Sequence, residues 1–319
     1  MAESSWTQGF AEFQAGLDVD QVECRAVLDG AANFDSGIRD ERIAGVVDDA
    51  LIEPGNSWAE RQEMLEDMSG AVAREVQRRF ATMKGAYPFH VRAGSIIHSP
   101  STTGVYEFCL FVARKPTGRS KMGISLSAIF EWIARDVMTA HFGAGARGFR
   151  TGAPVYPFEG RGVRTRETFQ KLEAQCGEFR WCPIPDFPDD PAPQYLKDCG
   201  LDIVVWKPWL DKRPGHFFAI GQCACGKNDI NVAKGRELSL DRLQNWLRPV
   251  TWARPTRCFL TALHIPNAVR LKELSTEAGI VFDRARLALT AETYPEQMRS
   301  VEGFDYLAEA AFAATQPVA

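Results

Sequence analysis

Two apolar segments that lie close together in the chain decide the fold: Gly200-Leu-Asp-Ile-Val-Val-Trp-Lys207 and Phe217-Phe-Ala-Ile-Gly-Gln-Cys-Ala224. Each is a short run rich in apolar, β-branched and aromatic residues, which is typical of a buried strand. Between them lies Asp211-Lys-Arg-Pro-Gly215, a stretch of turn-forming residues. The pattern predicts two adjacent antiparallel strands joined as a hairpin.

The flanking sequence alternates between strand and helix patterns. A long amphipathic run from Trp58 to Met83 predicts a helix within a mostly helical, acidic extension, residues 1–85. The further expected elements are a strand at 105–113, a helix at 125–141, a loop at 143–166, a helix within 238–247, a strand at 258–264, a helix at 268–278, a strand at 279–282 and a helix at 304–315. This order predicts an α/β domain over residues 86–319, with a central mixed sheet flanked by helices.

The composition is that of a globular protein. The chain has 319 residues, of which 45% are hydrophobic and 24% charged, and its formal net charge is −4. An acidic chain does not bind nucleic acid through its overall charge, so such binding requires a local basic patch. The sequence shows no signal-peptide pattern and no run of ~18 apolar residues. We therefore expect a cytoplasmic protein without a membrane partner, whose eight cysteines are reduced thiols.

Two polar residues interrupt the hairpin strands, Asp202 in the first and Gln222 in the second. A carboxylate in an apolar strand is costly to bury unless it is paired or binds a metal ion. Adjacent strand ends that each supply an oxygen ligand can hold Mg²⁺, which prefers a few protein oxygens and retained waters. The alternatives are an aspartate that accepts hydrogen bonds from neighbouring backbone amides and a satisfied buried amide.

The hairpin resembles the core of the PD-(D/E)XK, or restriction-endonuclease-like, superfamily. There an aspartate begins one strand, a (D/E/Q)-x-K triplet lies on the next, and a glutamate often sits on the preceding helix. The resemblance covers roughly residues 105–290. It implies that Asp202 is the aspartate, Gln222 begins the triplet, and Glu131 in Ile129-Phe-Glu-Trp-Ile133 is the helix glutamate. The wider pattern also resembles uncharacterised bacterial proteins associated with anti-phage defence.

The resemblance implies a metal-dependent endonuclease with Mg²⁺ or Mn²⁺ as cofactor. The ion would be held by Asp202, Gln222, the backbone carbonyl of Cys223 and Glu131, the last directly or through water. A different interpretation of Glu131 is an ion pair with Arg135 on the same helix. The cysteines favour small buried thiols over a zinc site or a nucleophile.

The triplet departs from the family pattern because its lysine position is Ala224. In the family that lysine orients or activates the attacking water. Lys227 follows Gly226, where the chain can turn back, and is the expected replacement. Lys207 is the less favoured candidate, because it lies five residues after Asp202 and so on the opposite face of a regular strand.

An arginine-rich stretch supplies the expected nucleic-acid contacts. Its planar guanidinium groups can bind phosphate through two hydrogen bonds, although a solvated loop paired with Glu159 and Glu167 fits as well. The arginines concerned are Arg147, Arg150, Arg161, Arg164 and Arg166. The expected partner is double-stranded DNA, with a homodimer or partner defence proteins as further possibilities. The competing hypothesis is a catalytically degenerate nuclease fold that acts as a binding or assembly module.

Overall fold

The structure is a computed structural model, and most of the chain can be described from it. The described residues are 3–34, 58–152, 170, 173–182, 200–226, 232–245, 247–299 and 305–315.

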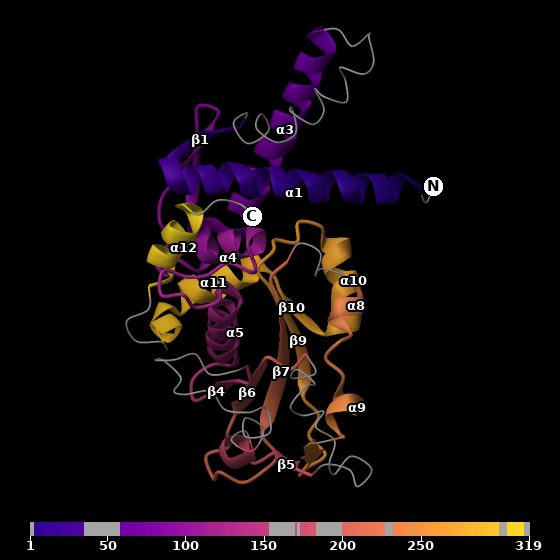
Figure 1. The fold of residues 1–319 in the computed structure, drawn as a ribbon. Helices are drawn as coiled ribbons and strands as arrows, with labels where there is room; N and C mark the ends of the chain where they lie inside the picture. Colours follow the sequence, from indigo (N-terminus) through magenta and orange to yellow (C-terminus); the bar gives the residue numbers. More distant parts are fainter. Residues whose placement is uncertain are drawn as a thin grey trace.

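The centre of the molecule is a five-stranded mixed sheet (Figure 1). Its strands, in spatial order, are β10 (Ile280–Phe282), β9 (Thr256–Thr261), β7 (Phe217–Ala224), β6 (Ile203–Lys207) and β4 (Arg147–Arg150). Strand β6 runs antiparallel to both β4 and β7, whereas β7, β9 and β10 are parallel to one another. The predicted hairpin and the mixed α/β fold are therefore confirmed.

Side chains alternate between the two faces of this sheet, and each face has its own core. Ile203 and Val205 of β6 point toward α5 (Leu126–Phe142) and join the largest buried cluster. Val204 and Trp206 point the other way, into a cluster covered by a two-stranded ribbon. The ribbon consists of β5 (Phe179–Trp181) and β8 (Leu247–Pro249). We call the side of the sheet that is covered by α5 the α5 face, and the side that is covered by the β5–β8 ribbon the ribbon face.

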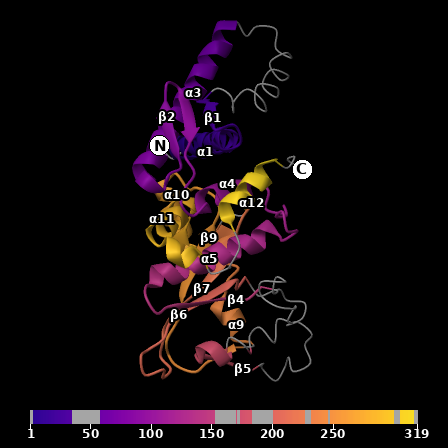
Figure 2. The ribbon, with the colours of Figure 1, turned by 90° about the vertical axis from the view of Figure 1, so that its left-hand side faces the viewer.

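The N-terminal part forms a layer at one end of the sheet (Figure 2). It contains α1 (Glu3–Asp29), α3 (Trp58–Met83), η1 (Lys84–Ala86) and a small antiparallel sheet of β1 (Ala31–Asn33), β3 (Ser95–His98) and β2 (Phe89–Arg92). The predicted helix at 58–83 is confirmed. The small sheet pairs residues from both sides of position 85, where we expected the extension to end, and one buried cluster contains Val22 of α1 together with Ile129 of α5.

The segment expected to be a strand at 105–113 is instead a helix, α4 (Val105–Arg114). All residues from Val105 to Ala113 are buried, because α1, α5, α11 and α12 pack around this helix. A helix enclosed by other helices is buried on every side, so its sequence is mostly apolar. The run from Val105 to Ala113 contains a single charged residue, the buried Glu107, and its β-branched and aromatic residues favour the wrong element.

Further helices with described bounds lie after the hairpin. They are α8 (Val232–Gly235), α9 (Leu240–Leu243), α10 (Ala268–Ala278), α11 (Arg284–Thr293), the short η3 (Pro295–Arg299) and α12 (Tyr306–Thr315). The expected helices at 268–278 and 304–315 are confirmed, whereas the one within 238–247 is a single turn, and β4 occupies part of the expected loop at 143–166. Among the described helices, none combines the length and hydrophobicity needed to cross a bilayer.

Candidate functional site

Asp202 lies directly before β6, at the open end of the hairpin. Its amide donates to the carbonyl of Gly221 at 3.0 Å, and its Oδ2 accepts a hydrogen bond from the amide of Cys223 at 2.6 Å. These two bonds tie the aspartate to β7 through its backbone and its side chain. A bond from a backbone amide was one of the two interpretations of this residue, and it holds the carboxylate in place whether or not the group also binds an ion.

Cys223 identifies the side chains that gather on the α5 face. Burial raises the pKa of its thiol well above the usual value, and the negative charges of Asp202 and Glu131 raise it further, while Arg150 opposes them. Of these groups, Asp202 contacts Cys223 directly through the backbone amide. A protonated thiol is a poor nucleophile, and a cysteine mechanism is not supported here.

Arg150, the last residue of β4, forms an ion pair with Glu131 of α5. Its Nη1 lies 2.5 Å from Oε2 of the glutamate, and its side chain is almost fully buried. A Cβ atom at position 152 would lie 2.5 Å from this Nη1 and 2.9 Å from this Oε2, so Gly152 leaves the space that the pair occupies. Arg135, the partner expected from helical spacing, contacts Asp136 at 2.9 Å.

Gln222 projects to the ribbon face, away from Cys223. It alternates with Gly221 and Cys223, and its neighbours on its own face are Ile220 and Ala224. Its Nε2 donates to Oε2 of Glu237 at 2.9 Å, and its buried Oε1 has no hydrogen-bond partner among the described residues. Gln222 thus binds Glu237 through its side chain, whereas the Asp202 carboxylate binds the amide of the next residue, Cys223.

The expected cationic residues that the structure describes lie at separate positions. Arg147 is exposed at the start of β4, whereas Arg150 is buried and is not part of a surface. Lys207 ends β6, where its Nζ donates to the carbonyl of Phe142 at 3.4 Å. Five strand residues place it about 16 Å from Asp202. The remaining expected residues, Lys227, Arg161, Arg164 and Arg166, lie outside the described part of the chain.

The groups on the α5 face fit a hard divalent cation in their chemistry. Asp202 and Glu131 supply carboxylate oxygens, and the Cys223 carbonyl is a further oxygen of the same kind, whereas its neutral thiol does not suit Mg²⁺. Within the described residues, no group of three or more histidine, cysteine, aspartate or glutamate side chains is arranged to hold a metal ion. Two carboxylates, a carbonyl and retained waters would make up such a site.

A second cluster of charged residues, which the sequence analysis missed, joins the N-terminal helices to the sheet. Arg79 of α3 and Arg284 of α11 are 1% and 0% exposed. Arg284 binds Asp20 of α1 through two bonds of 2.7 and 2.8 Å, and Arg79 contacts both Asp20 and Glu23. Burial opposes the ionisation of Asp20, but the two guanidinium groups hold its pKa below the usual value, whereas burial raises the pKa of Glu23.

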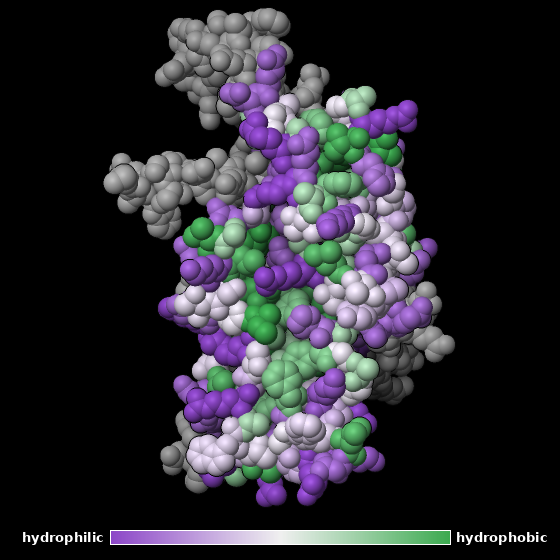
Figure 3. Space-filling model, turned by 180° about the vertical axis from the view of Figure 1, so that it is seen from behind, coloured by the Kyte–Doolittle hydropathy of each residue, from purple (hydrophilic) through white to green (hydrophobic). Residues whose placement is uncertain are grey.

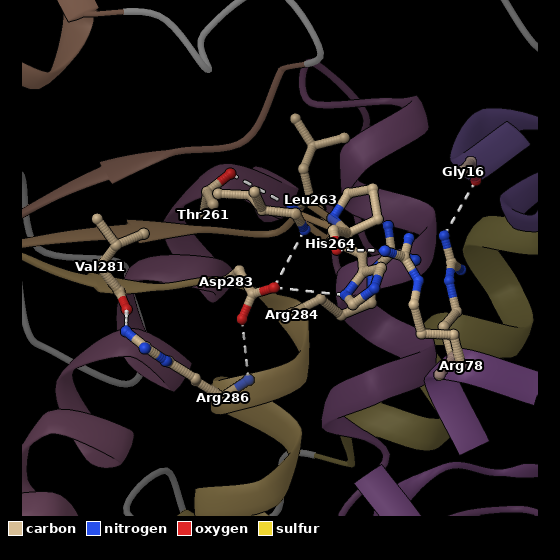
Figure 4. Close-up of polar contacts among 12 residues, drawn as sticks. Gly16, Arg78, Thr261, Leu263, His264, Val281, Asp283, Arg284 and Arg286 are labelled. Atoms are coloured by element: carbon tan, nitrogen blue, oxygen red, sulfur yellow. Dashed lines mark hydrogen bonds and ion pairs between the residues drawn. The ribbon is translucent and has the colours of Figure 1, made fainter. Parts of the chain in front are cut away.

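His264 extends this cluster toward β10 (Figure 4). Its ring nitrogens lie 3.4 Å from Glu75 and 3.3 Å from Asp283, and Asp283 also accepts bonds from the amides of Ile265 and Arg286. Burial raises the pKa of Glu75, but His264 and Arg79 outweigh it and lower the pKa to about 2. These charges are paired with one another inside the core, so we infer that the cluster stabilises the fold. The one local sequence pattern that indicates this cluster is the i, i+4 spacing of Glu75 and Arg79.

Comparisons of the chain with models of protein families, with curated proteins and with solved structures found no match.

Proposed function

We propose that the chain is a metal-dependent endonuclease that hydrolyses phosphodiester bonds, with DNA as the expected substrate. One observation carries the proposal: the Cys223 amide holds the Asp202 carboxylate at the start of β6, and Glu131 of α5 pairs with Arg150, which lies opposite Ile203, the residue after Asp202. Two acidic groups near one another on a sheet face are a common way to hold a catalytic cation.

The resemblance to the PD-(D/E)XK superfamily supports this proposal, because the helix and the two hairpin strands follow one another in the order expected for that superfamily. A helix with a glutamate precedes the hairpin, an aspartate stands at the start of one hairpin strand, and the next strand passes beside it. On β7, Gln222 binds Glu237 through its side chain, so the backbone carbonyl of Cys223, whose amide holds Asp202, is the oxygen that β7 would offer in this proposal.

The residues on this face have separate roles in the proposed reaction. A bound Mg²⁺ or Mn²⁺ would activate water and offset the charge that develops on phosphate oxygens. Asp202, fixed by the Cys223 amide, and Glu131, fixed by Arg150, are the groups that would hold the ion. Arg150 also brings a positive charge close to a site where the lysine position of the motif is occupied by Ala224.

A specific observation also favours the second hypothesis, a catalytically degenerate binding module. Gln222 faces the ribbon side, and the Glu131 carboxylate is already paired with a buried arginine. A carboxylate that is neutralised by a cation has less affinity for a metal ion. In this case the fold would bind nucleic acid or a partner protein without cleaving a phosphodiester bond.

A cleavage assay with three matched variants distinguishes the two. Purified protein is incubated with plasmid DNA and Mg²⁺ or Mn²⁺, and nicking and linearisation are followed on gels. We expect Asp202→Asn and Glu131→Gln to reduce cleavage by roughly a hundredfold or more, since each removes a proposed metal ligand without a large change in volume. Asp211→Asn is the control, because this exposed aspartate pairs with Arg213 at the far tip of the hairpin.

Each outcome of this assay decides between the hypotheses. If the wild type and the Asp211→Asn control cleave while the other two variants do not, the endonuclease is supported. If no protein cleaves with either metal although thermal melts show that all are folded, the degenerate module is supported. Equal cleavage by all four proteins would show that neither the Asp202 nor the Glu131 carboxylate is needed for cleavage.

A further inference from the structure

A hollow of about 200 Å³ lies on the ribbon face of the sheet, beside α9 (Figure 1). Its inner wall is apolar. Val204 of β6 and Ile220 of β7 line it from the sheet, and Leu243 of α9 and Leu247 of β8 line it from the covering elements. All four side chains are buried. A cavity of about 150 Å³ in another protein holds benzene, so this hollow has room for one flat ring system.

The outer edge of the hollow, which we call the rim, is polar and aromatic. It consists of four exposed residues that also line the hollow: Asp241, Gln244, Trp252 and Arg254. The backbone amide of Gln244 donates to the carbonyl of Leu240 at 3.1 Å and so continues the turn of α9. Asp241 and Gln244, three residues apart on this turn, therefore lie on the same side of it. The rim thus offers a carboxylate, an amide, an indole ring and a guanidinium group.

The polar groups of the rim are available to a ligand. Among the described residues, the side chains of Asp241, Gln244 and Arg254 take part in no hydrogen bond or ion pair. Trp252 is 98% exposed, so the fold does not bury its ring. Thr251 also lines the hollow, but its hydroxyl already donates to Oε2 of Glu178 at 2.9 Å. A ligand in the hollow would therefore meet three polar side chains without partners.

Only two charges line the hollow, the carboxylate of Asp241 and the guanidinium group of Arg254. Other charged residues of the ribbon and its surroundings do not line it: Glu173, Glu178, Arg180, Arg248 and Arg257. Glu178 accepts bonds from two backbone amides at the hairpin tip as well as from Thr251. Arg257 donates to two backbone carbonyls. The ligand thus faces one negative and one positive group.

This combination of groups matches a single nucleotide. A nucleobase has flat faces that suit apolar side chains and an edge that carries hydrogen-bond donors and acceptors. A carboxylate such as Asp241 accepts a bond from the amino group of cytosine, and the amide of Gln244 can bind adenine through two bonds. The guanidinium group of Arg254 suits the phosphate. A simple apolar acid would occupy Arg254 but would leave Asp241 without a donor.

The surface outside the hollow does not favour a lipid or a protein as the ligand. In the view from behind, hydrophilic side chains and pale ones of intermediate hydropathy dominate the lower end, where β5 lies in Figure 1, and larger apolar patches lie further up (Figure 3). A lipid surface or a protein that buries apolar area requires a wide apolar patch. A small apolar hollow with a polar rim instead suits one ring.

We propose that this hollow binds the base of one unpaired nucleotide within a nucleic-acid strand. The base carries an exocyclic amino group, as adenine and cytosine do, and Asp241 and Gln244 bind its edge while Arg254 binds the phosphate. A base in a duplex is stacked and paired, so its faces and its edge become accessible only when it leaves the helix. The inference rests on the proposed function in its choice of a nucleotide, but the binding needs neither the metal ion nor cleavage.

Binding of mononucleotides in EDTA tests this proposal, because no cleavage takes place there. Isothermal titration calorimetry measures the affinity of the wild type for the monophosphates of deoxyadenosine, deoxycytidine and thymidine. We expect the first two to bind roughly tenfold more tightly than the third, because thymine has no exocyclic amino group. An oligodeoxycytidine should displace the cytosine nucleotide.

Two variants of the rim separate the base from the phosphate. Asp241→Asn should bring the three affinities close together, because an asparagine amide can donate to the carbonyl oxygen of thymine. Arg254→Gln should weaken all three nucleotides roughly tenfold and leave the affinity for the nucleosides unchanged. Ala253→Leu places a larger side chain in the lining of the hollow and should abolish binding, while thermal melts show that the variant is folded.

The matched controls are Asp67→Asn and Arg92→Gln, which make the same changes at exposed positions of α3 and β2 in the N-terminal layer. We expect both to keep the wild-type affinities. The inference is wrong if no nucleotide binds, if the wild type binds all three equally, or if the controls lose as much affinity as the rim variants. Benzoate that binds in place of the nucleotides would make the hollow a site for an apolar acid.

Two further outcomes concern the strand and the proposed activity. An oligodeoxycytidine that does not displace the cytosine nucleotide would show that the ligand is a free nucleotide and that the assignment to a strand is wrong. Plasmid cleavage without nucleotide binding would overturn this inference and leave the proposed activity standing. Nucleotide binding without cleavage by any of the folded proteins would do the reverse.

Discussion

The Arg150 guanidinium lies 2.5 Å from the Glu131 carboxylate and is buried between α5 and the edge strand of the sheet. A metal ion and this arginine compete for the same oxygens, so the ion pair sets the affinity of the proposed site. We expect Arg150→Gln to lower the free energy of unfolding by about 1.5–3 kcal/mol in EDTA, because a charge-assisted bond is lost. Mn²⁺ should then raise the melting temperature of the variant more than that of the wild type.

The double variant Glu131→Gln/Arg150→Gln is the control for this prediction. It removes both charges, so we expect it to be more stable in EDTA than the single variant and to respond less to Mn²⁺. Thermal melts with and without MnCl₂ measure both effects. A double variant that Mn²⁺ stabilises as strongly as the single one would show that the ion binds elsewhere.

Gln222 offers a test of which face of β7 carries the chemistry. Its Oε1 is buried without a partner, so Gln222→Met removes an unsatisfied acceptor together with the bond to Glu237. We expect the free energy of unfolding to change by less than about 1 kcal/mol and plasmid cleavage to stay at the wild-type level.

Gln222→Glu is the informative counterpart. It places a second carboxylate beside Glu237 in a buried position, so we expect a clear loss of stability in urea unfolding. The opposite pattern, with cleavage lost in Gln222→Met and kept in Gln222→Glu, would restore Gln222 as a metal ligand.

Glu75 should control the resistance of the fold to acid. Its pKa is lowered from 4.5 to about 2 in the folded protein, so the unfolded chain binds the proton first as the pH falls. The carboxylate therefore contributes stability that is fully present above about pH 4.5 and is lost as the pH falls toward 2. We expect Glu75→Gln to lower stability at pH 7 and to flatten the decline between pH 4.5 and 2.

Urea unfolding midpoints across this pH range measure the effect. Glu273→Gln on α10 is the matched control, because Glu273 is exposed and pairs only with Arg270 on its own helix among the described contacts. Parallel pH curves for the wild type and Glu75→Gln would contradict the assignment.

Glu178 should determine how firmly the hairpin tip is held against the ribbon. Its carboxylate accepts two backbone amides through Oε1 and the Thr251 hydroxyl through Oε2. Glu178→Gln replaces the charged acceptor of these bonds by a neutral one. We expect the free energy of unfolding to fall by about 1.5–3 kcal/mol and hydrogen exchange at the amides of Gly215 and His216 to become faster.

Thr251→Val separates the two halves of this contact. It removes the Oε2 bond alone, so we expect it to leave the exchange of the two tip amides nearly unchanged. If it accelerates their exchange as much as Glu178→Gln does, the tip is held by the ribbon as a whole and not by this carboxylate.

The sequence predicts the hairpin and several helices because their signals are local. Alternating faces, turn residues and helical spacing all lie within one short window. The strand predicted at 105–113 is wrong because a short, mostly apolar run that is rich in β-branched and aromatic residues has the local signal of a buried strand, although it forms a helix enclosed by other helices.

The candidate site stays a prediction from the sequence. The sequence proposes Asp202, Gln222 and Glu131, but no local pattern reveals that the Asp202 carboxylate binds the Cys223 amide or that the Gln222 side chain binds Glu237. Arg150 as partner of Glu131, and the buried arginines 79 and 284, depend on contacts between distant segments that no local pattern encodes.

The bidentate contact between Asp20 and Arg284 has a consequence for how the chain is made. The two residues are 264 positions apart in sequence. During translation Asp20 can pair with Arg79 early, but Arg284 is added only when nearly the whole polypeptide has been synthesised. Such long-range closure slows folding, so a nascent chain that stops before position 284 should be retained by chaperones or degraded.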